Sequence, residues 1–120
     1  MGKYVDGFVL PIKAENIEKY REIAQKAGEI WKEYGALQYI EAVGDDLEIE
    51  NMLSFRKIAR SRDDETVIFA WIVFESRQER DRINAAVMKD ARIKEAMAPD
   101  DKTFDFKRMA YGGFKTLVEL

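Results

Sequence analysis

The segment TVIFAWIVFES, residues Thr66–Ser76, constrains the fold more than any other part of the chain. Its β-branched and aromatic residues favour a strand, in which successive side chains point to opposite faces. Both sets of side chains are apolar here, so water must be kept from both faces of the sheet. One set is Val67, Phe69, Trp71 and Val73, and the other is Ile68, Ala70, Ile72 and Phe74.

Three further segments are predicted as strands. Lys3–Pro11 alternates over a short apolar run that proline closes, and Ala36–Gly44 alternates in the same way. Phe106–Leu120 is the last predicted strand, and Gly112-Gly113 interrupts it. Glycine inside a strand is typical of a bulge or of a close approach by another group.

Two helices are predicted between these strands. Apolar residues at steps of three and four indicate a helix from about Ala14 to Tyr34, with Gly35 as its C-terminal stop. Ser76, followed three residues later by Glu79, forms a capping box that begins a second helix at about Arg77 and carries it to Lys89.

The remaining segments are harder to assign. Asp45–Glu65 is predicted to be mostly irregular, and Met52–Arg60 inside it is an extended arm or a short strand. Asp90 is a candidate N-cap for a further short helix.

The element order is strand, helix, strand, strand, helix, strand, within one domain of residues 1–120. This order predicts an α+β fold of the ferredoxin-like βαββαβ type, an antiparallel sheet with both helices on one face. The second face then needs another cover, because large apolar side chains left in water invite association. A homodimer through the sheet face is the first interpretation. Alternatively, the Asp45–Glu65 segment folds over this face, or the face is the floor of a ligand site.

Side-chain size suggests which face meets the helices. Small and aliphatic residues suit close helix packing, whereas an aromatic face with embedded carboxylates suits a dimer interface. The face expected against the helices carries Val5, Gly7, Val9, Ile40, Ala42, Ile68, Ala70, Ile72, Ala110 and Gly112. The face expected at the interface carries Tyr4, Asp6, Phe8, Tyr39, Glu41, Phe69, Trp71, Met109 and Tyr111.

Composition excludes several kinds of chemistry. The chain contains no cysteine and no histidine, so it lacks thiolate chemistry and the commonest ligand of transition metals. We therefore expect no metal and no cofactor. A net charge of −3 disfavours general nucleic-acid binding. No apolar run is long enough for a membrane span, and no signal peptide is recognisable, so a cytoplasmic location is expected.

Four segments carry a resemblance that runs through the whole chain: YVDGFVLP, AGEIWKEYGALQYIEAVGDD, FAWIVFESRQERDRINAAVM and KRMAYGGFKTLVEL. In this order they resemble the YbaA-like family of small bacterial proteins of unknown function. The resemblance implies the dimeric α+β barrel fold, in which two ferredoxin-like subunits join their sheet faces. That fold also carries cofactor-independent monooxygenases, lactone isomerases, haem enzymes and ligand-sensing domains, so it does not determine a reaction. No catalytic residue is carried over from the family.

The candidate catalytic residues are Asp6 and Glu41, two carboxylates inside predicted strands. Burial of one member of such a pair can raise its pKa and suit it to acid–base work. The alternative interpretation is that both carboxylates only bond tyrosines, Arg108 or Lys115, or lie at a solvated rim of the interface. The ligand-binding candidates are Tyr4, Tyr39, Trp71, Asn84, Arg108 and Tyr111. The same aromatic residues can equally be packing groups in a core or an interface.

Two functions are the main interpretations of the sequence, and a haem enzyme is a third that the absence of histidine disfavours, although tyrosine can ligate haem. The first is a homodimer that binds or converts a small apolar or aromatic metabolite without a metal. The second is a non-catalytic dimeric interaction module, in which the aromatic face is only an interface.

Overall fold

The computed structural model describes residues 2–97, 103 and 105–120. Its main elements follow the predicted order and confirm the ferredoxin-like α+β fold. They are β1 (Tyr4–Lys13), α1 (Ile17–Tyr34), β2 (Gln38–Val43), β3 (Glu65–Phe74), α3 (Arg77–Lys89) and β4 (Ala110–Lys115). Shorter elements are η1 (Ala14–Asn16), α2 (Phe55–Ala59), α4 (Ala91–Ala96) and η2 (Phe106–Arg108).

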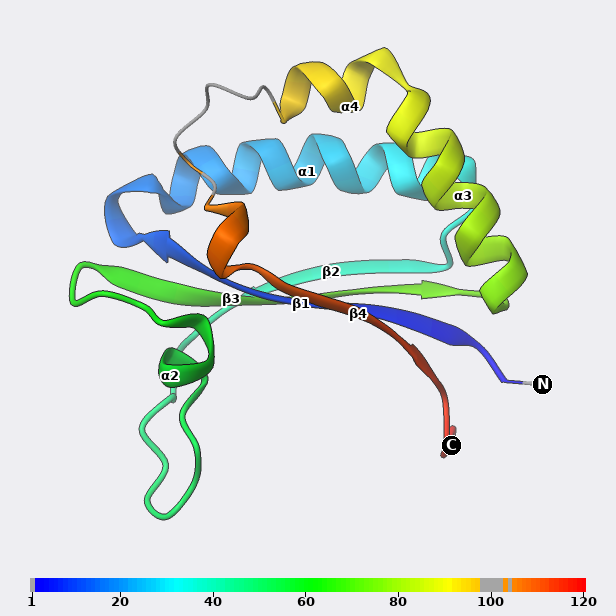
Figure 1. The fold of residues 1–120 in the computed structure, drawn as a ribbon. Coiled ribbons are helices and arrows are strands. Elements are labelled where there is room, and N and C mark those ends of the chain that lie inside the picture. Colours follow the sequence, from blue (N-terminus) through cyan, green and yellow to red (C-terminus); the bar gives the residue numbers. More distant parts are fainter. Residues whose placement is uncertain (1, 98–102, 104) are drawn as a thin grey trace.

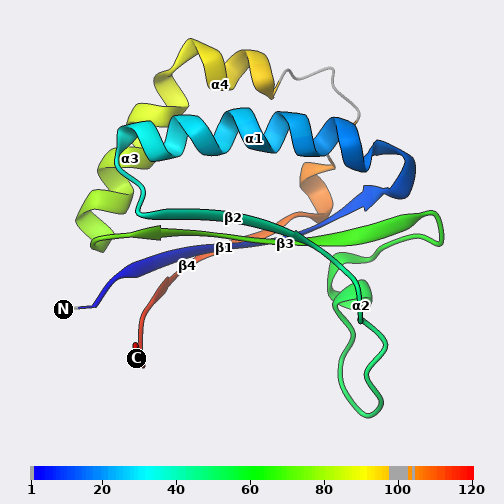
Figure 2. The same cartoon turned by 180° about the vertical axis from the view of Figure 1, so that it is seen from behind.

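The four strands form one antiparallel sheet in the order β2-β3-β1-β4. The helices α1, α3 and α4 lie together on one face of this sheet (Figures 1 and 2). On the opposite side, α2 and the loop next to it project away from the sheet near one end, and the C-terminal residues project near the other. In the part of the chain that the structure describes, no helix is long and apolar enough to cross a membrane.

The predicted helix boundaries are confirmed where the sequence carries local signals. Gly35 ends α1 with a φ of 121°, a value that L side chains rarely adopt. Ser76 caps α3, and its hydroxyl accepts a hydrogen bond from the Glu79 amide at 3.1 Å. Asp90 caps α4 in the same manner, through the amide of Arg92.

Three local expectations were wrong. Residues 55–59 form the short helix α2, capped by Ser54, rather than a strand or an extended arm. Gly112 and Gly113 pair regularly with β1 and do not interrupt β4. Pro11 lies inside β1 rather than at its end, because β4 pairs only with Tyr4–Val9 and leaves β1 an edge beyond that point.

The assignment of sheet faces was correct for β3 and wrong for β1, β2 and β4. Asp6 on β1 and Glu41 on β2 point toward the helices, since their side chains bond residues of α3 and α1. Tyr4, Phe8, Tyr39 and Tyr111 share this face, as do Ile68, Ala70 and Ile72 of β3. The opposite face, here named the open face, carries Val5, Gly7, Val9, Ile40, Ala42, Phe69, Trp71, Ala110, Gly112 and Phe114.

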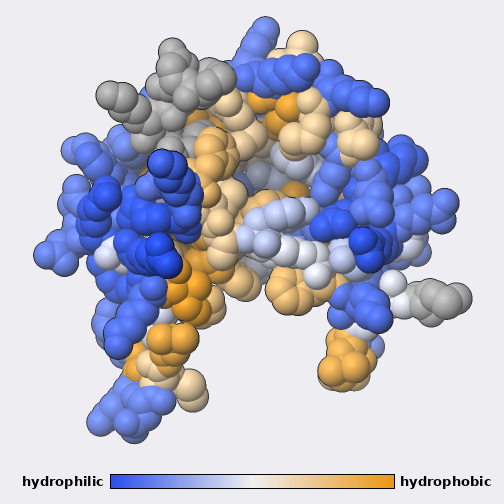
Figure 3. All heavy atoms as spheres, in the orientation of Figure 1, coloured by the Kyte–Doolittle hydropathy of each residue, from blue (hydrophilic) through white to orange (hydrophobic). Residues whose placement is uncertain are grey.

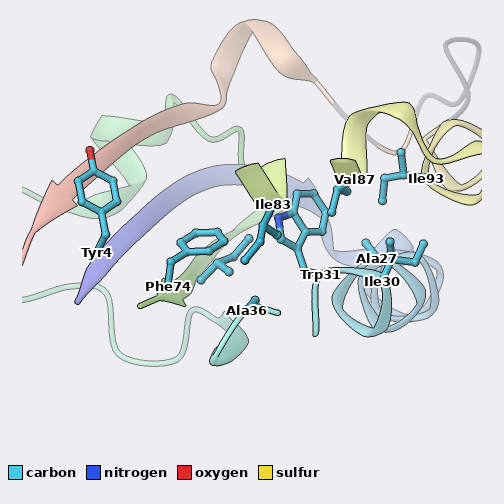
Figure 4. Close-up of a cluster of buried hydrophobic side chains, with 10 residues drawn as sticks. Tyr4, Ala27, Ile30, Trp31, Ala36, Phe74, Ile83, Val87 and Ile93 are labelled. Carbon is cyan, nitrogen blue, oxygen red and sulfur yellow. The ribbon is translucent and has the colours of Figure 1, made fainter. Parts of the chain in front are cut away.

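The helix-side core consists of two clusters of buried side chains. The first joins α1, α3 and α4 to the sheet around Trp31, Phe74 and Ile83, as Figure 4 shows. The second packs the start of α1 on the sheet through Leu10, Tyr20 and Ile68 among others. Each fully buried large side chain contributes about 1.5–3 kcal/mol, so these clusters are the main source of stability.

The open face is covered at one end only. There α2 packs on β1 and β3, where Pro11, Ala59 and Val67 are buried. Beyond α2, Phe69 is 44% exposed and Phe114 is 61% exposed. The alternative in which the Asp45–Glu65 segment covers the second face therefore holds for that end only, and the described residues leave the centre of the face open.

Candidate functional site

A carboxylate held by two tyrosines lies between α1 and the sheet. Tyr20, on α1, donates a hydrogen bond of 2.5 Å to Oε1 of Glu41. Tyr39, two residues before Glu41 on β2, donates one of 2.5 Å to Oε2. Tyr20 belongs to the apolar stripe of α1, which turns its hydroxyl toward the sheet, and Tyr39 shares the helix-facing side of β2 with Glu41.

Glu41 stands in the wall between two cavities. The outer cavity has a volume of about 530 Å³ and runs along the edge strand β2 beneath α1. The inner cavity, of about 90 Å³, lies deeper between α1 and the sheet and is lined by Phe8, Trp31 and Met109 among others. Tyr20, Tyr39 and Glu41 line both cavities, so the carboxylate can be reached from the outer one.

Gly28, on α1, leaves the space that the ring of Tyr39 needs to reach Glu41. A Cβ atom at this position of α1 would lie 2.6 Å from Cδ1 of Tyr39. Glycine in a helix interior costs about 1 kcal/mol relative to alanine, so its presence here needs a reason. The reason in this structure is that the ring of Tyr39 packs directly on the helix backbone, which places its hydroxyl at Glu41.

The electrostatics of Glu41 favour proton uptake. Burial raises the pKa of Glu41, while the hydrogen bonds from Tyr20 and Tyr39 partly offset that rise. Burial and the charge of Glu41 likewise raise the pKa values of Tyr20 and Tyr39, so both remain donors. The described residues offer Glu41 these two hydroxyls and no lysine or arginine as an ion-pair partner.

Such a carboxylate can act as a general base. A raised pKa brings a carboxyl group closer to neutral pH, where it combines an ionised resting state with useful basicity. The tyrosine hydroxyls can then donate to a ligand oxygen that becomes negative when it loses its proton. In the described part of the chain, no group of three or more acidic residues is arranged to hold a metal ion.

The second candidate carboxylate, Asp6, has a different environment. It is fully buried, and Oδ1 accepts a hydrogen bond of 2.9 Å from Nε of Arg80. Its Oδ2 accepts from the Asn84 amide at 3.0 Å and from the Tyr111 hydroxyl at 3.2 Å. Asn84 in turn accepts a hydrogen bond from the indole of Trp31 at 2.9 Å. Asp6 is thus satisfied on all sides and joins β1, β4, α1 and α3.

This network also explains Gly113, the second glycine of the pair in β4. A Cβ atom at Gly113 would lie 2.5 Å from the Tyr4 hydroxyl and 2.7 Å from Nη2 of Arg80. The missing side chain leaves room for the guanidinium, which lies 5.2 Å from the centre of the Tyr4 ring. Asn84 and Arg80 therefore point into the protein, toward Asp6.

The remaining predicted ligand residues lie away from Glu41. Trp71 is on the open face, and its indole donates to Gln38 at 3.3 Å. Arg108 forms a bidentate ion pair with Glu65, with Nη1–Oε1 at 2.7 Å and Nη2–Oε2 at 2.8 Å. Of the predicted residues, only Tyr39 joins Glu41 at the cavity.

Tyr20 is the member of the site that the sequence interpretation missed. A tyrosine at helical spacing resembles a core position, so in the sequence Tyr20 is indistinguishable from the apolar residues that predict α1. A signal was present, since a tyrosine in a buried stripe needs a partner for its hydroxyl and β2 offers a carboxylate in a strand.

The comparisons with known proteins agree with the fold and leave the reaction open. A family described as "Protein of unknown function (DUF1428)" matches residues 3–106. The chain belongs to this family. The uncharacterized protein YbaA of Escherichia coli strain K12 is 39% identical over 117 residues, which cover 98% of each chain. The uncharacterized protein YbaA of Shigella flexneri matches with the same identity and coverage. The predicted YbaA-like family is therefore confirmed.

Two solved structures share the fold at low sequence identity. A Nipsnap family protein of unknown function from Agrobacterium tumefaciens has a TM-score of 0.59 and 15% identity, over 96% of this chain and 88% of that one. A conserved protein of unknown function from Bacteroides thetaiotaomicron, described as a "Possible Oxidoreductase", has a TM-score of 0.54 and 17% identity. That match covers 93% of this chain and 94% of the other. Both likenesses concern the fold.

Proposed function

We propose that this protein binds a small apolar or aromatic molecule in the cavity beneath α1 and that Glu41 takes a proton from it. The observation that carries the proposal is the Tyr20–Glu41–Tyr39 arrangement in the shared wall of the two cavities. A partly buried carboxylate without a cation is costly to maintain, and titratable groups with perturbed pKa values cluster at functional sites.

The size and lining of the cavities suggest how a ligand lies. The outer cavity, at about 530 Å³, falls within the range of 300–1,000 Å³ that is typical of small-molecule sites. The inner cavity, at about 90 Å³, is smaller than the ~150 Å³ apolar cavity that admits benzene. The body of the ligand therefore occupies the outer cavity, and its acidic C–H or O–H group points at Glu41.

The proposed step is a proton transfer. The ligand proton moves to a carboxylate oxygen of Glu41, and the electron pair of the broken bond remains on the ligand as an enolate or phenolate oxygen. A tyrosine hydroxyl that leaves Glu41 then donates to this oxygen. Return of the proton to another atom of the ligand would complete an isomerisation without any further reagent.

Fluorescence of Trp31 tests the binding half of this proposal. The chain has two tryptophans, and Trp71→Phe leaves Trp31, which lines the inner cavity, as the only reporter. The probes are nitrobenzene and 4-nitrophenol, the latter kept below its own pKa so that its hydroxyl can donate to Glu41. We expect saturable quenching by both probes and tighter binding of 4-nitrophenol.

Glu41→Gln isolates the contribution of the carboxylate. A hydrogen bond to a charged acceptor is worth about 1 kcal/mol more than one to a neutral acceptor, so the preference for 4-nitrophenol should fall about 5- to 10-fold. Glu22→Gln, an exposed position of α1 outside both cavities, is the matched control. Absence of saturable quenching, or an equal fall in the control, would refute the site.

We also propose that the protein is a homodimer through the open face. Its support is the exposed apolar centre of that face and the likeness of the fold to subunits of dimeric α+β barrels. Phe114→Arg places a charge on an exposed position of the face, and burying that charge would oppose association. Sedimentation equilibrium should show a dimer for the wild type and a monomer for the variant. A wild-type monomer at all concentrations would contradict this proposal.

A further inference from the structure

The segment between β2 and β3, residues 44–64 and here named the arm, has an ordered base. The Ser54 hydroxyl accepts from the Arg56 amide at 3.0 Å and begins α2. The guanidinium of Arg56 donates to the carbonyls of Glu65 and Arg62, both at 3.0 Å. Farther out, the Met52 amide bonds the Ile49 carbonyl at 3.3 Å and closes a turn at the tip. These contacts hold the arm away from its own domain.

The arm nevertheless exposes apolar side chains. Met52 is 73% exposed and Leu53 is 70% exposed. Apolar side chains exposed on an ordered projection do not stabilise the fold of an isolated domain. Ile49, Phe55 and Ile58 are between 42% and 51% exposed.

These side chains continue onto the open face. The ring of Phe55 lies 5.7 Å from that of Phe69, and Phe69 lies 5.5 Å from Trp71, measured between ring centres. Beyond Trp71 the cross-strand neighbours Gly7 and Gly112 have no side chains and form the floor of a hollow of about 520 Å³. Phe69, Trp71 and Phe114 line the same hollow.

The arm and the C-terminal residues flank this hollow. Figure 3 shows hydrophobic side chains on the side of the arm that faces the space beneath the sheet. It also shows a hydrophobic tip on the opposite projection, where Leu117, Val118 and Leu120 are 73% exposed or more. The open face therefore lies between two projections that carry apolar side chains, the arm and the C-terminal residues.

We infer that the arm is a clasp that grips a second copy of this chain, with Met52 and Leu53 as its contact residues. The inference rests on the proposed homodimer and adds the surface that secures it. The open face has a hollow at Gly7 and Gly112 between two apolar projections. This shape fits a second copy of the same face turned across it, as the isologous contact of a twofold dimer requires.

The exposed apolar area agrees with this occupant. The apolar side chains of the arm, with Phe69 and Phe114, expose roughly 400–600 Å² in total. A standard interface buries about 800 Å² per partner, of which about 450–520 Å² is apolar. The arm also carries Asp45, Asp46, Glu48 and Glu50, which would repel an anionic lipid surface.

The test is the dissociation constant of the purified full chain, measured by sedimentation equilibrium for the wild type and for Met52→Ser/Leu53→Ser. Both substituted side chains are exposed in the single chain, so the fold should be retained, as far-ultraviolet circular dichroism would show. Met88→Ser, at a 51% exposed position of α3 on the helix side, is the matched control. We expect the double substitution to raise the dissociation constant about 10- to 100-fold and the control to leave it unchanged.

The outcomes separate the clasp from the dimer itself. A wild-type dimer whose dissociation constant is unchanged by Met52→Ser/Leu53→Ser, yet lost in Phe114→Arg, would overturn the clasp and retain the sheet-face dimer. A wild-type monomer at every concentration would overturn both. Hydrogen exchange supplies a second measurement, since a clasp predicts that amides of residues 47–53 are slower to exchange in the dimer than after dilution to monomer.

Discussion

Replacing Glu65 by glutamine would remove the charge from one half of a buried ion pair at the base of the arm. The carboxylate accepts two hydrogen bonds from the guanidinium of Arg108 and a third, of 2.6 Å, from the amide of Arg62. Its side chain is 4% exposed and that of Arg108 is 12% exposed, so water screens the pair little. Arg108 also bonds Asp105 at 2.7 Å, and its Nη1 donates to the Arg60 carbonyl at 2.9 Å, which ties the arm to the segment before β4.

The size of the effect follows from the acidity of Glu65. Its hydrogen bonds to Arg108 lower the pKa of Glu65 from 4.5 to about 2, although burial acts in the opposite direction. A shift of this size corresponds to about 3 kcal/mol of folding free energy. Because the folded-state pKa is the lower one, this stability is present above pH 4.5 and is lost as the pH falls toward 2. At pH 3 about half of it remains.

Urea unfolding at pH 7 and at pH 3 measures the difference between the wild type and Glu65→Gln. We expect the variant to be about 3 kcal/mol less stable at pH 7 and about 1.5 kcal/mol less stable at pH 3. Glu48→Gln removes a carboxylate that is 80% exposed and 4.0 Å from Arg56, and should change stability by less than about 0.5 kcal/mol at either pH. An equal loss at both pH values for Glu65→Gln would show that packing, not charge, is responsible.

Three further predictions concern the helix side of the sheet. Because burial raises the pKa of Glu41, the wild type should become more stable as the pH falls through that pKa. Glu41→Gln should abolish this rise and leave the stability at pH 7 unchanged or higher, as urea midpoints between pH 7 and 4.5 would show. Gly28→Ala should cost about 1–3 kcal/mol despite the better helix propensity of alanine, because the ring of Tyr39 must move; unchanged thermal unfolding would contradict the close contact. Asp6→Ala should cost about 3–5 kcal/mol in denaturant unfolding, since it leaves Arg80 without its buried partner, and a loss below 1 kcal/mol would count against that role.

The helix ends were predictable because their signals are local. Gly35 and Ser76 act through their own backbone and their nearest amides, so four residues of sequence contain the whole interaction. The structure of the arm was not predictable, because its sequence carries few local signals. The helix α2 has only five residues, which is too short for a hydrophobic period to show, and it is held by Arg56 through carbonyls six and nine residues away.

The candidate site was half predictable. Asp6 and Glu41 stood out as carboxylates inside strands, and both do point to one face of the sheet. Their difference in character could not be read from the chain, because it depends on partners far away in sequence. Asp6 meets Arg80, 74 residues later, whereas Glu41 meets Tyr20 on the preceding helix. The first pairing gives Asp6 a guanidinium partner, whereas the described residues give Glu41 two hydroxyls and no cation.

The sequence by itself determined the order of the elements, the ends of the longer helices, the fold class and the family. The first three depend on period, on capping residues and on the number of elements, which are properties of neighbouring residues, and the family follows from the resemblance of four segments to known relatives. Only the tertiary structure decided which sheet face meets the helices. Both faces are apolar, and a strand presents its two faces by the same alternation, so hydrophobicity alone could not distinguish them. The choice depends on whether the tyrosines and carboxylates of β1 and β2 find donors, and those donors lie on α1 and α3, on one side of the sheet.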